Sequence, residues 1–234
     1  LAVAYPNLPE ISGLTDYRPK LPMRLYSADE VLLGEFGEER RSFAPIAEIP
    51  KVMQHAVLAI EDARFYEHSG VDYKGVLRAG LAHLSEARSQ GASTITMQVA
   101  RNFYLSTEKT FTRKIYEVLL ALKIESLLSK EQILEVYMNQ IFLGQRAYGF
   151  AAASEIYFGK PLKDISVAEA AMLAGLPKAP SAYNPIVNPK RATERQQYII
   201  DRMLENGFIS TAQHDAAKAE KLHYRTQSEV SVHA

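Results

Sequence analysis

The sequence predicts a mostly α-helical fold with a short β-hairpin near its start. From Pro50 onward, apolar residues recur at the spacing of one helix face. Three serines, Ser129, Ser166 and Ser210, are each followed three residues later by Gln or Glu, the capping box that begins a helix. Before Pro50 the pattern differs, because two short apolar runs flank a polar turn, as in a hairpin.

The elements follow in chain order. Residues 6–22 carry four prolines and are expected to form an extended lead-in. Met23–Tyr26 and Val31–Phe36 flank the polar segment Ser27–Glu30 and are expected to pair as the hairpin. Asn206-Gly207 is typical of a helix end. Helices are expected at about 51–67, 73–86, 94–102, 111–128, 130–141, 145–156, 167–174, 190–205 and 211–220.

Composition excludes several classes of protein. The 234 residues are enough for a sizeable core and fit one domain, or one domain with a small appendage. Lys and Arg number 27 and so do Asp and Glu, so no overall charge draws in nucleic acid. The chain has no Cys and therefore no disulfide or thiolate–metal framework. No apolar run reaches the roughly 18 residues of a membrane-spanning helix.

The first candidate site is the segment 61–70, which reads EDARFYEHSG after an apolar helical stretch. If the helix continues, Glu61, Phe65 and His68 share one face. A carboxylate beside an aromatic ring on an apolar helix suits a general acid or base. A surface helix with solvated charges remains the alternative.

A second candidate site combines Arg113, Lys114 and Glu117 on one expected helix. Arg grips phosphate with two parallel hydrogen bonds, and Lys acts as a point charge, so the cluster suits an anionic ligand. The charges alone favour an ordinary ion pair on a helix surface. On the preceding helix, Thr94 and Gln98 are four residues apart and would face one groove with neutral donors and acceptors.

Five segments in chain order carry a resemblance to a known family. They read EDARFYEHSG at 61–70, GASTITMQVARN at 91–102, RKIYE at 113–117 with Ala121 and Glu125, ILEVYMN at 133–139 running to YFGK at 157–160, and EAA at 169–171 followed by LPKAPSAYNP at 176–185. In this order and spacing they resemble the peptidoglycan glycosyltransferase domain, glycosyltransferase family 51, of class A penicillin-binding proteins and monofunctional transglycosylases. One departure is visible: the second motif usually has Gln-Gln where this chain has Met97-Gln98.

The resemblance implies a fold and a reaction. The fold is a larger lysozyme-like lobe with a small membrane-facing jaw lobe. The reaction joins lipid II to a growing glycan strand with inversion and releases undecaprenyl pyrophosphate. The place is the periplasmic face of a bacterial inner membrane, with the membrane surface and other cell-wall synthesis proteins as partners. The expected domains are a lead-in with hairpin at 1–44, the glycosyltransferase domain at 45–210, and a C-terminal helix with the start of a linker to a missing domain at 211–234.

The same resemblance assigns roles residue by residue. Glu61 is the general base, and Glu117 is a second catalytic carboxylate that orients the cations or holds a divalent cation, Mg or Mn. Asp62 is expected to make local hydrogen bonds that shape the site. The apolar stretch Phe103–Phe111 is expected to touch the membrane. The substrate-binding residues are Asp62, Phe65, His68, Ser93, Thr94, Gln98, Arg101, Asn102, Arg113, Lys114, Tyr137, Lys178 and Ser181.

Two other functions stay open. A lysozyme-like muramidase or lytic transglycosylase would also use a catalytic Glu but would degrade glycan, and it has no pyrophosphate to hold with Arg113 and Lys114. A non-catalytic helical scaffold leaves the clustering of polar residues unexplained. Convergence of Glu61, Gln98, Lys114 and Glu117 would distinguish an enzyme from a scaffold.

Overall fold

The structure is a computed structural model that describes residues 8–15, 23–26, 28, 32–36, 40–77, 93–104 and 111–225. The chain forms two compact units. Unit 1 comprises Leu1–Tyr17 and Glu61–Tyr137, and unit 2 comprises Arg18–Ile60 and Met138–Ala234. The described residues are mostly helical, which confirms the predicted fold class. None of the described helices is both long and apolar enough to cross a membrane.

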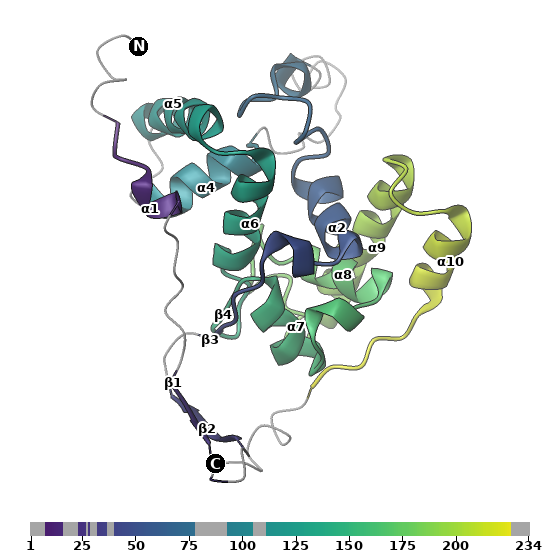
Figure 1. Cartoon of the computed structure of the whole chain (residues 1–234). Helices are drawn as coiled ribbons and strands as arrows, with labels where there is room; N and C mark the ends of the chain where they lie inside the picture. Colours follow the sequence, from purple (N-terminus) through teal and green to yellow (C-terminus); the bar gives the residue numbers. More distant parts are fainter. Residues whose placement is uncertain are drawn as a thin grey trace. The chain divides into compact units, whose positions relative to one another are not determined.

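Unit 1 is built around two packed helices, α4 (Ile95–Tyr104) and α5 (Phe111–Leu127), which lie side by side in Figure 1. The unit also contains α1 (Ser12–Thr15), the last residue of α2 (Lys51–Glu61), helical residues 73–77, and most of α6 (Lys130–Gln140). Met97 on α4 packs with Val71 and Ala121 in a small buried cluster. Position 97 is buried in this cluster, where an apolar side chain is favoured. The packing therefore accounts for Met97 in place of the first Gln of the usual Gln-Gln.

Unit 2 contains the strands and the C-terminal helices. Strand β1 (Met23–Tyr26) pairs antiparallel with β2 (Leu32–Phe36), which confirms the hairpin. Strand β3 (Arg40–Arg41) pairs in parallel with β4 (Ala147–Tyr148). The helices are most of α2, then α7 (Phe150–Phe158), α8 (Val167–Ala174), α9 (Pro189–Glu205) and α10 (Thr211–Ala219), with 3-10 turns η2 (Ile46–Glu48) and η3 (Leu162–Asp164).

Helix α8 is the centre of unit 2. Every residue from Ala168 to Ala174 is buried, so the helix is covered on all sides and can be apolar all round. Helix α9 packs against α8, and α10 packs against both of them. Gln196 on α9 donates to the backbone oxygen of Ala168 at 2.9 Å, so a buried amide there serves the backbone of a neighbouring helix.

All three predicted capping boxes are present. In each, the serine oxygen accepts from the backbone N–H three residues later, and that residue's side chain accepts from the serine N–H. The helix end predicted at Asn206-Gly207 is also found: α9 ends at Glu205, and Gly207 has a φ of 73°. These signals are local, so the sequence identifies them without knowledge of the tertiary fold.

Three predicted elements are wrong. The helix expected to reach residue 67 ends at Glu61, because Asp62 leaves the helix and its carboxylate accepts from the backbone N–H of Ile95 at the start of α4. The helix expected at 145–156 begins only at Phe150, since residues 147–148 form β4 and Gly149 sits at a φ of 82°. A Cβ at Gly149 would lie 2.7 Å from the Asn139 oxygen, so the close turn requires glycine. The lead-in contains the short helix α1 in its described part.

Some predictions fall outside the described residues. These are the lead-in at 6–7 and 16–22, the helix expected at 78–86, the stretch 105–110 and the tail from residue 226.

Candidate active site

Glu61 is the last residue of α2 and contacts a chain of polar groups within unit 1. The Gln98 Nε2 donates to Glu61 Oε2 at 3.2 Å, and the Tyr137 hydroxyl donates to Gln98 Oε1 at 3.3 Å. Burial, and next the charge of Glu61, raise the pKa of Tyr137 well above its ordinary value, so its hydroxyl stays protonated. Glu61 therefore faces a donor whose own partner is a buried phenol.

Asp62 organises the loop that follows Glu61. Both of its carboxylate oxygens lie 2.8–2.9 Å from His68 Nε2, and Oδ2 also accepts from the backbone N–H of Ile95 at 3.1 Å. The other ring nitrogen of His68, Nδ1, accepts from the backbone N–H of Gly70 at 3.1 Å. This pattern assigns the proton to Nε2, since Nδ1 is an acceptor. The expectation that Asp62 makes local hydrogen bonds is confirmed.

The face expected to join Glu61, Phe65 and His68 does not exist as predicted, because the helix ends at Glu61. Phe65 lies instead in a turn, and its ring is fully buried. The Lys130 ammonium lies 4.3 Å from the centre of that ring and is also 2.6 Å from Glu125 Oε1. Thr96 donates to the same Glu125 oxygen at 2.7 Å. Phe65 thus packs against the partly buried ion pair of Lys130 and Glu125, and its predicted contact with substrate stays a prediction.

Thr94 is the N-cap of α4 rather than a residue within it, which corrects the expected helix start. Its Oγ1 accepts from the backbone N–H of Met97 at 3.1 Å and donates to the Gly70 oxygen at 2.6 Å. The hydroxyl therefore satisfies one of the free N–H groups that every helix start leaves. Thr94 and Asp62 together fix the N-terminus of the helix that carries Gln98 and Arg101.

The candidate site has two clusters of polar groups, or poles. The first is Glu61 with Gln98, and the second, the cationic pole, is Glu117 with Arg101, Lys114 and Ser93. The Glu117 side chain is 1 % exposed. Arg101 donates to both of its oxygens, at 2.9 and 3.2 Å, and Lys114 donates to Oε1 at 3.0 Å. Burial alone would raise the pKa of Glu117, but the hydrogen bonds and charges of Arg101 and Lys114 outweigh it and lower the pKa. Ser93 Oγ accepts from Lys114 at 2.8 Å and from Arg101 at 3.3 Å.

Helix α4 connects the two poles. Gln98 and Arg101 are three residues apart, so they lie on neighbouring positions of one face, about 4.5 Å apart along the helix axis. Gln98 reaches Glu61, and Arg101 reaches Glu117. Glu61 thus pairs with Gln98, and Glu117 pairs with Lys114 and Arg101, so α4 carries one member of each cluster. That the two clusters converge on one groove stays a prediction.

The remaining predicted ligands divide between the units. Asn102 is exposed and Arg113 is half-buried, both within unit 1. Lys178 and Ser181 are exposed residues of unit 2. Their roles as ligands stay predictions. Most of the predicted membrane-contacting stretch lies outside the described residues; Phe103 at its start is half-buried.

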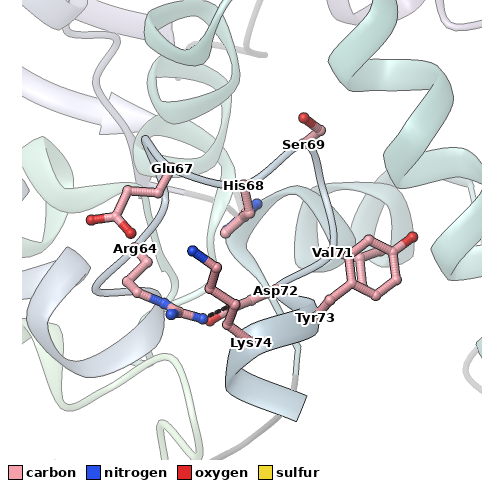
Figure 2. A pocket seen from close by; sticks show the side chains of 8 residues that line it. All are labelled: Arg64, Glu67, His68, Ser69, Val71, Asp72, Tyr73 and Lys74. Carbon is pink, nitrogen blue, oxygen red and sulfur yellow. Dashed lines mark hydrogen bonds and ion pairs between the residues drawn. The ribbon is translucent and has the colours of Figure 1, made fainter. Parts of the chain in front are cut away.

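A pocket beside His68 was not predicted from the sequence. Figure 2 shows its lining, from Arg64 to Lys74, with Arg64 joined to Asp72 by a dashed line. The pocket measures about 280 Å³. Arg64 Nε lies 3.2 Å from Asp72 Oδ2, and the hydrogen bond from Gly75 N–H and the charge of Arg64 outweigh burial and lower the pKa of Asp72. The only signal in the sequence was the alternation of charges around His68.

The donor set around Glu117 bears on the predicted divalent cation. Among the described residues, no group of three or more His, Asp or Glu side chains could hold a metal ion. Both Glu117 oxygens already accept hydrogen bonds from cationic side chains. A divalent cation at Glu117 would have to displace Arg101 or Lys114, so these residues do not fit such an ion as they stand.

Comparisons with known proteins agree with the motifs. A family model described as transglycosylase matches residues 29–204. Penicillin-binding protein 1A of Neisseria gonorrhoeae is 59 % identical over 225 residues, which cover 96 % of this chain and 28 % of that protein. A candidate transglycosylase of Cupriavidus necator is 62 % identical over 183 residues, which cover 78 % of this chain and 79 % of that protein.

A solved structure is also similar. The crystal structure of penicillin-binding protein 1A from Haemophilus influenzae matches with a TM-score of 0.52 and 31 % sequence identity, over 89 % of this chain and 22 % of that one. The chain thus spans 28 % of the Neisseria gonorrhoeae protein and 22 % of the Haemophilus influenzae chain. With the family model covering most of the residues and the motifs in place, the chain belongs to the transglycosylase family, the peptidoglycan glycosyltransferases.

Proposed function

We propose that the chain polymerises lipid II into glycan strands, with Glu61 as the general base and inversion at the anomeric carbon. One observation carries the proposal: a single face of α4 sets an amide against Glu61 and a guanidinium against Glu117. A base and a cationic pole on adjacent positions match the two needs of the reaction, proton removal and support of a leaving pyrophosphate.

The chemical step uses the two poles together. Glu61 takes the proton from the 4-hydroxyl of the incoming sugar as that oxygen attacks the anomeric carbon of the lipid-linked strand. The bond from that carbon to the pyrophosphate oxygen breaks, and its electron pair leaves with undecaprenyl pyrophosphate. Attack from the face opposite the leaving group inverts the centre. Holding both sugars in line converts the encounter into an effectively unimolecular step.

The cationic pole suits the leaving group. The side chains of Arg101 and Lys114 are 37 % and 47 % exposed, whereas Glu117 between them is 1 % exposed. The carboxylate therefore lies inside and aims two cations outward, where a diphosphate can meet them. Arg101, Lys114 and Glu117 together carry one positive charge. Arg113, on α5 next to Lys114, adds a second.

The glycan-degrading alternative is less well supported. A muramidase or lytic transglycosylase would also use a carboxylate such as Glu61. It releases no pyrophosphate, so it gives no reason for Arg101, Lys114 and Ser93 to gather around Glu117. The chain's membership of the transglycosylase family favours the synthetic reaction.

Incubation with lipid II tests the proposal. The unaltered protein should convert lipid II into polymer, and Glu61→Gln should reduce polymer yield at least ~10²-fold, since it removes the base and keeps the shape. Glu131→Gln on the exposed side of α6 is the matched control and should retain full activity. A folded Glu61→Gln protein with normal polymer yield would refute the assignment of the base.

The cationic pole has its own test. Lys114→Ala and Arg113→Ala should each weaken binding of the phosphoglycolipid inhibitor moenomycin by about 10- to 100-fold, the cost of one charge-assisted contact of about 1.5–3 kcal/mol. Lys123→Ala on the same helix is the control, since Lys123 donates to the Pro9 backbone oxygen instead. Equal affinities for all three variants would limit these cations to a structural role.

The proposed substrate carries an insoluble lipid, so the site must work next to a bilayer, on the periplasmic face in this proposal. Phe103, half-buried at the end of α4, begins the stretch expected to touch that surface. Phe103→Ser should reduce sedimentation with liposomes and leave the melting temperature nearly unchanged. A lowered melting temperature with unchanged sedimentation would show that Phe103 serves the core instead.

A further inference from the structure

Three side chains form a chain of contacts from α6 through α4 to the end of α2. Tyr137 donates to Gln98 Oε1, and Gln98 Nε2 donates to Glu61 Oε2. All three residues belong to unit 1. Tyr137 is 1 % exposed, so it cannot meet a substrate directly in this arrangement, although the sequence placed it among the ligands.

We propose that Tyr137 is a positioning residue whose buried hydroxyl sets the orientation of the Gln98 amide and thereby keeps an N–H donor on Glu61. The proposal rests on the function proposed above, with Glu61 as the base. It assigns Gln98 a role in holding the base, in addition to any contact with substrate.

The argument depends on the two unlike ends of an amide. Oε1 can only accept a hydrogen bond and Nε2 can only donate. The Tyr137 hydrogen needs an acceptor because a buried, unpaired hydroxyl is costly. Among the described residues, Gln98 Oε1 is the acceptor that the structure gives it. A flipped amide would leave that hydrogen unpaired and would turn an oxygen toward the carboxylate of Glu61.

The orientation matters for the chemical step. A donor on Glu61 Oε2 favours the ionised carboxylate, which is the form that accepts a proton. The same hydrogen bond restricts rotation of the carboxylate, so the second oxygen keeps one direction. Tyr137 is suited to this work because its hydroxyl stays protonated across the working pH range, so its role as donor does not change with pH.

Tyr137→Phe is the direct test, because it removes only the hydroxyl. In polymerisation of lipid II, kcat should fall about tenfold, the effect of one hydrogen bond, with KM unchanged. The acidic limb of the pH–rate profile should move to higher pH by up to about one unit, because the carboxylate loses part of the support for its ionised form. Affinity for moenomycin should not change, since the cationic pole is intact.

Tyr157→Phe is the matched control. Tyr157 is also a fully buried tyrosine, and its hydroxyl donates to the Leu143 oxygen at 2.7 Å in unit 2. Its loss should lower the melting temperature about as much as Tyr137→Phe, with no change in kcat or in the pH profile. If both variants move the profile equally, or neither moves it, the positioning role of Tyr137 is overturned.

A second variant keeps the proposal falsifiable if Tyr137→Phe does not fold. Gln98→Met replaces the amide of this half-buried side chain with an apolar group. It should move the acidic limb of the pH–rate profile in the same direction as Tyr137→Phe. In the double variant, Tyr137→Phe should add little to Gln98→Met, because both act through one amide. Fully additive losses would contradict the proposal. Activity in Glu61→Gln would instead remove the proposed function itself, so the two failures are distinguishable.

Discussion

The two units of the chain use their buried polar side chains differently. In unit 1, Asp62 bonds to His68 of its own loop and to the start of α4, and Glu117 bonds to Lys114 of its own helix and to Arg101 of α4. In unit 2, Glu169 closes the capping box of its own helix and accepts from Lys160 nine residues earlier, and Gln196 serves a backbone oxygen. The difference indicates that unit 1 holds reactive groups in place, whereas unit 2 completes the ends and backbones of its helices.

The largest expected effect comes from changing one buried carboxylate in each unit. Glu117→Gln should reduce polymerisation by about 10²-fold, because an amide cannot aim both Arg101 and Lys114 at a diphosphate. Glu169→Gln should leave polymerisation within about twofold, because Gln can still complete a capping box. Rates with lipid II and melting temperatures of both variants provide the comparison. Comparable activity losses in the two variants would remove the contrast between the units.

Helix caps give a second, smaller contrast. Thr94→Ala and Ser210→Ala each remove an N-cap and should each cost about 1 kcal/mol of unfolding free energy, with Thr94→Ala at the upper end because its hydroxyl also donates to Gly70. Only Thr94→Ala should also slow polymerisation, about tenfold, since α4 carries Gln98 and Arg101. Urea unfolding and initial rates measure the two effects separately. Normal rates for Thr94→Ala would show that the start of α4 tolerates movement.

Low pH should remove the stability that Glu117 contributes to unit 1. The folded-state pKa of Glu117 lies below its ordinary value of 4.5, so its contribution to stability is fully present above pH 4.5 and is lost as pH falls through the lowered value. The melting temperature of Glu117→Gln should therefore fall less steeply than that of the unaltered protein below pH 4.5. Parallel curves would show that Glu117 titrates alike in both states.

The smallest expected effect concerns His214 in unit 2, whose contribution to stability is lost as pH rises, whereas that of Glu117 is lost as pH falls. His214 on α10 lies 2.7 Å from Asp201 on α9 and 2.9 Å from Asp215, and Asp201 also accepts from Lys218. The hydrogen bond to Asp201, and next that to Asp215, raise the pKa of His214 above 6.5. Its contribution is present below pH 6.5 and is lost as pH rises through the raised value. His214→Asn should make the melting temperature less dependent on pH in that range, with unchanged polymerisation.

Features that depend on neighbouring residues could be predicted from the sequence. The capping boxes at Ser166 and Ser210 were found because their partners are three residues away. The end of α2 was missed because its cause is a bond from Asp62 to Ile95, 33 positions along the chain. Arg101 was expected to bind substrate, but its bond to Glu117 was missed for the same reason, since the two residues are 16 positions apart. The motifs gave the candidate site residues, and the contacts among them required the fold.

Asp62 has a further consequence through its bond to the first N–H of α4. Glu61 and Gln98 are 37 positions apart, so small displacements along that length would accumulate if the two were aligned independently. Asp62, covalently next to Glu61, is also fastened to the helix that carries Gln98. The proposed base and the Gln98 amide are thus both positioned relative to the start of α4. The position of the proposed base is therefore tied to the start of the helix that carries Gln98.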